Sequence, residues 1–374
     1  MKKLLLFFLV FVLFLTSCNN DSSIIKNGKI VKIGVLVPLS GKNKRFSQQS
    51  LDGLLAAKKM QAYLENGTEI KFIVADTQSD IGETRKAFYS LVKQDVKVII
   101  SLMGSDKTIE MQAVLEANKI PLIVSLATDN KITNLANNIS QVCFTNNIQA
   151  LVAAHYIRDE KLISNVGIIY DRSNHYSYSL AKEFKKYYES IGGTVDFYMN
   201  VKNVKEVEKL KKKQYLSTSI LYNTTDIATT LEILKFMKKK YPDMEYISGD
   251  GLLSSVMALK SFDKTLLNGV YVTEHYAHNI QKNKRRKHLE KLLKRDGYSE
   301  SSYAFLAYDS YMLLYKALNR CENLDLVCIN NHLQNSETIH GASGNFTMHH
   351  GVSKRKVFID KIENMKLYKE IVTY

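Results

Sequence analysis

The feature that most constrains the fold of this chain is a regular alternation of short apolar runs with longer amphipathic segments. The first set of apolar runs begins at Lys29 and consists of KIVKIGVLVPL, IKFIVADT, VKVIISL and PLIVSLA. The second set begins after Ala150 and consists of NVGIIYD, TVDFYMNV, STSILYN, EYISGD and NGVYVTE. Runs that are apolar at nearly every position are typical of parallel strands buried on both faces. The alternation therefore predicts an α/β protein with two lobes, each a doubly wound parallel sheet covered by helices.

The segments between these runs carry apolar residues at helical spacing, which predicts the covering helices. In the first set we expect helices near Phe46–Leu64, Glu83–Gln94 and Thr108–Asn118. In the second set we expect helices near Tyr178–Ile191, Val204–Lys213 and Ile227–Lys240.

The N-terminus has the composition of an export signal. Lys2 and Lys3 precede an unbroken apolar run of 12 residues, Leu4–Leu15, which is shorter than the ~20 residues that a spanning helix needs. The following letters, LTSC, resemble the bacterial lipobox, in which the cysteine receives the lipid. We therefore expect residues 1–17 to be a lipoprotein signal peptide, Cys18 to be the lipid attachment site and residues 18–29 to be a linker. The alternative is a plain secretory signal that contains a cysteine.

Export and lipidation place the expected protein at the bacterial cell envelope, held to the membrane by its anchor. Without residues 1–17, the 374-residue chain keeps 357 residues, which suits two domains of ordinary size.

The basic charge of the chain is densest in KNKRRKHLEKLLKR, Lys282–Arg295. Leu289, Leu292 and Leu293 recur there at helical spacing, so we interpret the run as a solvated amphipathic helix. Because an exported protein seldom meets nucleic acid, we expect no nucleic-acid partner. Attraction to an anionic membrane or a cell-wall polymer is the alternative.

The three cysteines after Cys18 point to a disulfide rather than to a metal site. Cys321 and Cys328 flank ENLDLV, a connector after a helix, and export permits a bridge between them. Cys143 lies in the apolar run SQVCFT and is expected to be a small core residue. No cysteine has partners at metal-ligand spacing, and the neighbours His349 and His350 are interpreted as a turn pair. We expect no metal and no cofactor.

The turns that follow the apolar runs are the candidate ligand site, because ligands of doubly wound sheets lie outside the carboxyl ends of the strands. These turns read PLSG, MGSDKT, ATDN, YDRSNHYSYS, NTTD and GDG. They are rich in small polar residues, glycine and tyrosine, which can hydrogen-bond a small polar ligand and leave room for it. The pattern is not an arrangement for catalysis, so we expect a binding protein and not an enzyme.

The motifs and their order resemble the type I periplasmic binding proteins of the leucine/isoleucine/valine group, the ligand-capturing subunits of ABC importers. The motifs that carry the resemblance are VKIGVLVPLSG, LDGLLAA, VGIIYDRSNHYSYSLAKEF, SGDGLL, YAFLAYDSYMLLYKAL and GASGNFTMHHG. The resemblance implies two lobes joined by three crossings. It assigns residues 30–146 and 278–335 to lobe one, and residues 147–277 and 336–374 to lobe two.

The same resemblance implies an amino acid or a similar small polar ligand, captured by lobe closure and delivered to a membrane permease. The ligand-binding residues that follow from it, together with the NTTD turn, are Phe46, Gly104, Ser105, Ala127, Thr128, Tyr176, Asn223 and Asp250. Asp250 would supply the countercharge that a buried ammonium group needs. The alternatives are a helix cap for Asp250, a surface turn for Tyr176 and a core contact for Phe46.

A different class of function is also compatible with the resemblance. Regulatory or sensory lipoproteins, including activators of cell-wall synthases, resemble this fold, and for them we expect an occluded or eroded cleft.

Replacement of Cys18 by alanine tests the anchor. Because the thiol is the only expected attachment point for lipid, Cys18→Ala should give a soluble or unprocessed product in detergent phase partitioning. A variant that loses its signal and still enters the detergent phase would contradict the lipoprotein interpretation.

Overall fold

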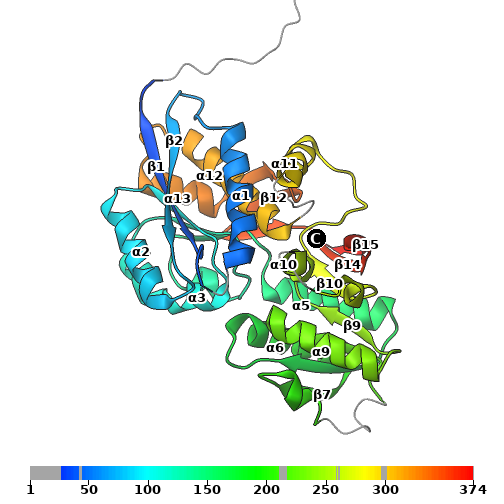
Figure 1. The fold of residues 1–374 in the computed structure, drawn as a ribbon. Coiled ribbons are helices and arrows are strands. Elements are labelled where there is room, and N and C mark those ends of the chain that lie inside the picture. The colour runs from blue at the N-terminus through cyan, green and yellow to red at the C-terminus, as the bar shows by residue number, and fades with distance from the viewer. Residues whose placement is uncertain are drawn as a thin grey trace, which may run out of the picture.

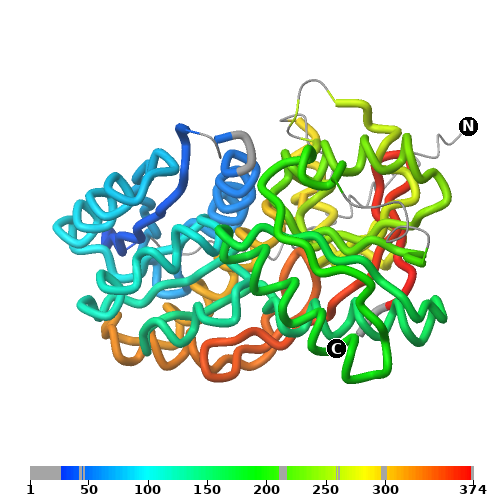
Figure 2. Tube along the Cα trace, turned by 90° about the horizontal axis from the view of Figure 1, so that it is seen from below, coloured from blue at the N-terminus to red at the C-terminus, as the bar shows by residue number. Residues whose placement is uncertain are grey.

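The computed structural model describes residues 27–41, 44–209, 217–257, 259, 262–295 and 301–373. They form two α/β lobes that lie side by side (Figure 1; Figure 2). The predicted fold class is therefore confirmed. Within the described residues, no helix has the length and apolar character required to cross a membrane.

Lobe one is built on an eight-stranded sheet with the order β11-β12-β13-β5-β4-β3-β1-β2. Its first five strands are parallel, and their apolar residues are largely buried because helices cover the sheet. They are β1 (Ile30–Val37), β2 (Glu69–Asp76), β3 (Val98–Ser101), β4 (Leu122–Val124) and β5 (Ile139–Gln141). The other three are β11 (Ser336–His340), β12 (Asn345–His349) and β13 (Val352–Arg355), joined in antiparallel pairs.

The helices of lobe one pack around α12, whose side chains are almost all buried. Gly53 lets α1 approach α12 closely, because it has no side chain. A Cβ atom at this position would lie 2.1 Å from the carbonyl oxygen of Ala304. The described helices are α1 (Lys44–Met60), α2 (Ile81–Lys93), α3 (Ser105–Glu110), α4 (Gln112–Ala117), α11 (Lys284–Arg295), α12 (Ser302–Asn319) and α13 (Leu326–Gln334), with the 3-10 turn η1 (Ile132–Asn134).

Lobe two is built on a seven-stranded sheet with the order β15-β14-β10-β9-β8-β6-β7. Its strands are β6 (Asn165–Tyr170), β7 (Thr194–Asn200), β8 (Ile220–Asn223), β9 (Glu245–Ser248), β10 (Tyr271–Glu274), β14 (Val357–Glu363) and β15 (Lys366–Thr373). The described helices are α5 (Asn146–His155), α6 (His175–Ser190), α7 (Val204–Val207), α9 (Ile227–Lys240) and α10 (Leu252–Met257), with the π turn η2 (Tyr156–Glu160) and the 3-10 turn η3 (Lys264–Leu267).

The chain passes between the lobes three times, after β5, after β10 and after β13. The assignment of residues 336–374 to lobe two is wrong for residues 336–355. These residues form β11–β13, and β13 pairs with β5 of lobe one through Val352 and Gln141. Only β14 and β15 return to the second sheet, so the third crossing lies between Arg355 and Val357.

A disulfide joins Cys321 to Cys328, between the end of α12 and the first turn of α13, with an Sγ–Sγ distance of 2.09 Å. His332 lies close to both sulfur atoms, and this trio is the one cluster of potential metal ligands in the described part of the chain. The bridge already occupies the two thiols. Cys143 is a buried free cysteine.

A buried ion pair holds the crossings against lobe one. The guanidinium of Arg355 donates to Asp309 Oδ2 over 2.6 Å and to the carbonyl oxygen of Val142 over 2.7 Å. The backbone amide of Ala342 donates to Asp309 Oδ1 over 2.6 Å, and the Ser343 hydroxyl donates to Oδ2. The two charged side chains are 0% and 2% exposed, so each depends on the other for compensation.

Replacement of Asp309 by alanine should therefore destabilise the protein strongly. Leaving Arg355 buried without a countercharge should lower the free energy of unfolding by about 3–5 kcal/mol. Urea denaturation measures this change. Lys86→Ala is the matched control, because its partner Glu83 lies at the surface and such pairs contribute roughly 0–1 kcal/mol. Equal midpoints for the two variants would show that the Asp309 pair does not hold the crossings.

Candidate functional site

Two of the turns predicted to bind a ligand meet where the two lobes touch. The side chain of Asp106, in the first turn of α3, accepts from the backbone amide of His175 over 2.6 Å and from Asn174 Nδ2 over 2.7 Å. Asn174 and His175 begin α6 of lobe two. The turn of Ser105 and the turn of Tyr176 are therefore neighbours across the lobe interface.

Asp250 lies at the centre of a polar cluster in lobe two. Its Oδ1 accepts from the hydroxyl of Tyr176 over 3.0 Å and from Gln149 Nε2 over 3.2 Å. Its Oδ2 lies 3.7 Å from His275 Nε2 and accepts no hydrogen bond from the described residues. The helix that follows, α10, does not use Asp250 as a cap, because none of its described amides donates to the carboxylate. Tyr176 and Asp250, each predicted separately to contact the ligand, therefore contact each other in the structure.

Three residues of this cluster were not predicted from the sequence. Gln149 on α5 connects the Asp250 turn to β10. Its Oε1 accepts from the backbone amide of Asp250 over 3.3 Å and from the Thr273 hydroxyl over 2.5 Å. Glu274 ends the run NGVYVTE and His275 follows it directly, and their position at the carboxyl end of β10 was the signal that could have identified them.

The lobe-one residues of the predicted site surround the ends of β3 and β4. The Ser105 hydroxyl accepts from the backbone amide of Asp129 over 3.2 Å, so it holds two turns together. Thr128 is buried, and its hydroxyl has no hydrogen-bond partner in the described part of the chain. The carbonyl of Ala127 accepts from Gln141 Nε2 over 2.7 Å. Gly104 borders open space, because a side chain there would meet nothing within 4 Å.

One predicted residue, Asn223, does not join this group in the structure. The side-chain oxygen of Asn223 accepts from the backbone amide and the hydroxyl of Thr225, over 3.0 and 2.8 Å, which satisfies it within its own turn. Phe46 belongs to α1, but its side chain lies outside the described residues.

Aromatic rings form the wall beside Asp250. Phe144 stacks on the imidazole of His275 with a centroid distance of 3.7 Å. The hydroxyl of Tyr222 is buried without a partner among the described residues. The glycines beside Asp250 make room for two more rings: a side chain at Gly249 would lie 2.0 Å from the Tyr176 hydroxyl, and one at Gly251 would lie 2.7 Å from the Tyr303 hydroxyl. These glycines thus accommodate the protein's own tyrosines.

Burial keeps the neighbours of Asp250 uncharged. Burial raises the pKa of Glu274 to about 8; a hydrogen bond from Ser302 opposes this shift and the charge of Asp250 adds to it. Burial lowers the pKa of His275 to about 4, even though Asp250 favours its protonated form. The pKa of Tyr176 is raised well above its usual value, first by burial and then by Asp250.

The lobe interface can therefore offer one carboxylate, several hydroxyls and an aromatic wall to a small polar molecule. The fold consists of two α/β lobes joined by three crossings, and polar groups of both lobes meet at the strand ends. This arrangement is typical of a two-lobed solute-binding protein. The family model described as "Periplasmic binding protein" matches residues 30–363, and the chain belongs to this family of non-enzymatic solute binders.

Solved structures share the fold at low sequence identity. A leucine binding protein from Thermotoga maritima is 22% identical with a TM-score of 0.82, covering 91% of this chain and 98% of that chain. An ABC transporter solute binding protein from R. palustris, in complex with 4-hydroxybenzoate, is 20% identical with a TM-score of 0.80, covering 92% and 97%. A branched-chain amino acid transporter substrate binding protein from Streptococcus pneumoniae, in complex with isoleucine, is 18% identical with a TM-score of 0.77, covering 92% and 99%. No curated protein sequence matches the chain.

The raised pKa of Glu274 predicts a specific pH dependence of stability. The unfolded chain releases this proton near pH 4.5, whereas the folded protein keeps it until about pH 8, so the free energy of unfolding should fall as pH rises between these values. His275 titrates with the opposite sign, between about 4 and 6.5, so the range from pH 6.5 to 8 isolates Glu274. Urea denaturation across that range should show a downward slope that Glu274→Gln flattens.

The control is Glu189→Gln, because Glu189 is exposed at the surface. This variant should show the same fall in the free energy of unfolding between pH 6.5 and 8 as the parent. A slope that persists in Glu274→Gln would show that another group carries it.

Proposed function

We propose that this chain is the extracytoplasmic substrate-binding lipoprotein of an ABC importer and captures an amino acid, or a similar small ligand with an ammonium group, between its lobes. The observation that carries the proposal is the incomplete pairing of the Asp250 carboxylate. Its Oδ2 accepts no hydrogen bond from the described residues, and no described Lys or Arg forms an ion pair with it. The Asp250 side chain is only 11% exposed, and a carboxylate in such surroundings without a cation is costly, so a ligand ammonium group is the natural partner.

The electrostatics favour an amino acid over a simple aromatic acid. Solved neighbours include a protein bound to isoleucine and one bound to 4-hydroxybenzoate. A benzoate-like ligand brings only a negative charge, which Asp250 would repel. The guanidinium of Arg355, whose field reaches His275, is committed to Asp309.

Both lobes would contribute partners for the polar groups of the ligand. Lobe one offers the unpartnered hydroxyl of Thr128 beside the open space at Gly104, and lobe two offers Asp250 and the Tyr222 hydroxyl. Because the groups come from two bodies, the ligand gains most contacts when the lobes are together. Differential affinity for the closed state would then drive closure.

The proposed partners follow from this role. A membrane permease would receive the ligand, and Cys18 would tether the protein to the cell envelope. Cys18 lies outside the described residues.

One observation favours a second candidate function, a regulatory or sensory lipoprotein such as an activator of a cell-wall synthase. The lobes are joined by direct hydrogen bonds: Gln49 Nε2 donates to the Ser254 carbonyl over 2.9 Å, and the Ser302 hydroxyl donates to Glu274 over 2.5 Å. An occluded interface is what this second function requires.

Replacement of Asp250 distinguishes the candidates. If the ligand is an amino acid, Asp250→Ala should leave its ammonium group uncompensated and cost about 3–5 kcal/mol, more than a hundredfold in affinity. Asp250→Asn should lose less, because it keeps an acceptor. Calorimetric titration with amino acids, small amides, benzoate and 4-hydroxybenzoate measures the affinities, and thermal unfolding without ligand checks the fold.

Asp226→Ala is the matched control. Asp226 caps α9 in the same lobe, so its loss should lower stability by roughly 1 kcal/mol without changing affinity. Equal affinity of the parent and Asp250→Ala for a true ligand would overturn the amino-acid proposal. Failure of the parent to bind any compound in the panel would favour the regulatory candidate.

A further inference from the structure

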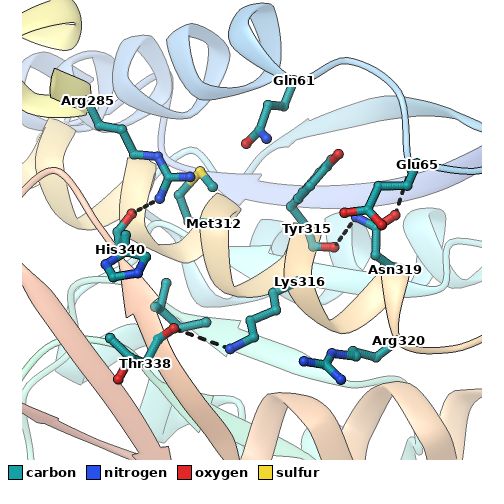
Figure 3. Close-up of a pocket in the computed structure, with 11 residues that line it drawn as sticks. Gln61, Glu65, Arg285, Met312, Tyr315, Lys316, Asn319, Arg320, Thr338 and His340 are labelled. Carbon is teal, nitrogen blue, oxygen red and sulfur yellow. Dashed lines mark hydrogen bonds between the residues drawn. The ribbon is translucent and has the colours of Figure 1, made fainter. Parts of the chain in front are cut away.

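Lobe one contains a large cavity at the end opposite to the lobe interface. It has a volume of about 550 Å³ and lies between the C-terminal ends of α1 and α12, the first turn of α11 and β11 (Figure 3). The N-terminal end of α12 carries Ser302 and Tyr303, which contact lobe two. At a rise of about 1.5 Å per residue, the cavity-lining residues of α12 and its C-cap, from Met312 to Arg320, lie roughly 14–26 Å along the helix from Tyr303, so the cavity is separated from the lobe interface.

Three cations line this cavity, and their charges are poorly neutralised. Arg285 donates to the carbonyl of His340, and Lys316 Nζ donates to the carbonyl of Thr338 over 3.2 Å, as Figure 3 shows. Lys316 and Arg320 share one carboxylate, Glu337, at 3.6 and 3.5 Å, and that side chain is 82% exposed. Arg285 forms no ion pair with a described residue.

The rest of the lining suits a phosphate group that carries an organic substituent. Met312, Tyr315 and Ile339 give a buried, largely apolar floor, whereas the amides of Gln61 and Asn319 are neutral. The one lining carboxylate, Glu65, is exposed and stands on the side of Asn319 in Figure 3, away from Arg285. Guanidinium groups bind phosphate oxygens through paired hydrogen bonds.

The position of the cavity indicates where such a phosphate would come from. Asn27, the first described residue, donates through Nδ2 to the carbonyl of Asn66 over 2.9 Å, and Asn66 follows the lining residue Glu65. Figure 1 shows the start of β1 and the end of α1 at the same end of lobe one. If Cys18 carries lipid, the nine residues from there to Asn27 reach at most about 30 Å. The cavity then lies near the membrane surface.

The helix α11 extends this basic surface beyond the cavity. Lys284, Lys287 and Lys291 are exposed and recur at helical spacing, so they lie on one face beside Arg285. Juxtamembrane clusters of this kind attract anionic lipid surfaces.

We propose that the cavity formed by Arg285, Lys316 and Arg320 binds the phosphate of an anionic phospholipid headgroup in the membrane that holds the chain. This proposal rests on the lipid anchor of the proposed function. Docking of the headgroup orients lobe one with its far end on the bilayer and the lobe interface pointing away from it.

The test titrates the full chain, purified in a non-ionic detergent, with dihexanoyl phosphatidylglycerol, dihexanoyl phosphatidylcholine and inorganic phosphate. The anionic lipid should bind at least tenfold more tightly than either of the others. The double variant Arg285→Gln/Arg320→Gln should reduce its affinity at least tenfold. Lys59→Gln, an exposed cation on α1 that does not line the cavity, is the control and should leave it unchanged.

Each other outcome overturns the proposal. Equal binding of phosphatidylcholine would show that the headgroup charge is not recognised, and equal binding of inorganic phosphate would make this a free-anion site. Unchanged affinity in the double variant would remove the cavity from the interaction. Thermal unfolding and amino-acid titration of the same preparations report on the fold and on the lobe interface, so a failure of the proposed function is seen separately.

Discussion

The buried pair of Asp309 and Arg355 is the interaction on which the arrangement of the lobes depends. Arg355 is the last residue before the third crossing, and its guanidinium also holds the carbonyl of Val142, where the first crossing begins. Asp309 lies in the middle of α12, and the next residue, Ser310, is hydrogen-bonded to Ser125 beyond β4 over 2.7 Å. One ion pair thus connects two crossings to the helix that also delivers Ser302 to the lobe interface.

The chemistry of the lobe interface follows from burial. Three titratable groups, Asp250, Glu274 and His275, lie together at strand ends, but Glu274 holds its proton and His275 remains neutral at neutral pH. A single carboxylate with a free oxygen is left, surrounded by hydroxyls and rings. This arrangement can distinguish ligands by charge while most of their contacts remain uncharged.

The two ends of α12 give lobe one two different surfaces. The N-terminal end meets lobe two through hydroxyl groups, and the C-terminal end borders the basic cavity of Lys316 and Arg320. The largely buried helix α12 keeps these surfaces apart, so an orientation of the protein on a membrane need not disturb the lobe interface.

The sequence by itself determined the α/β class, the two sheets and the turns that carry candidate ligand groups, because apolar periodicity and strand-end position are local properties. It also pointed to Tyr176 and Asp250. Only the tertiary structure decided that β11–β13 join the first sheet, that Gln149, Glu274 and His275 surround Asp250, and that glycines 249 and 251 accommodate tyrosines. Strand pairing across the chain, burial and the pKa shifts that burial causes depend on distant residues, which no local pattern records.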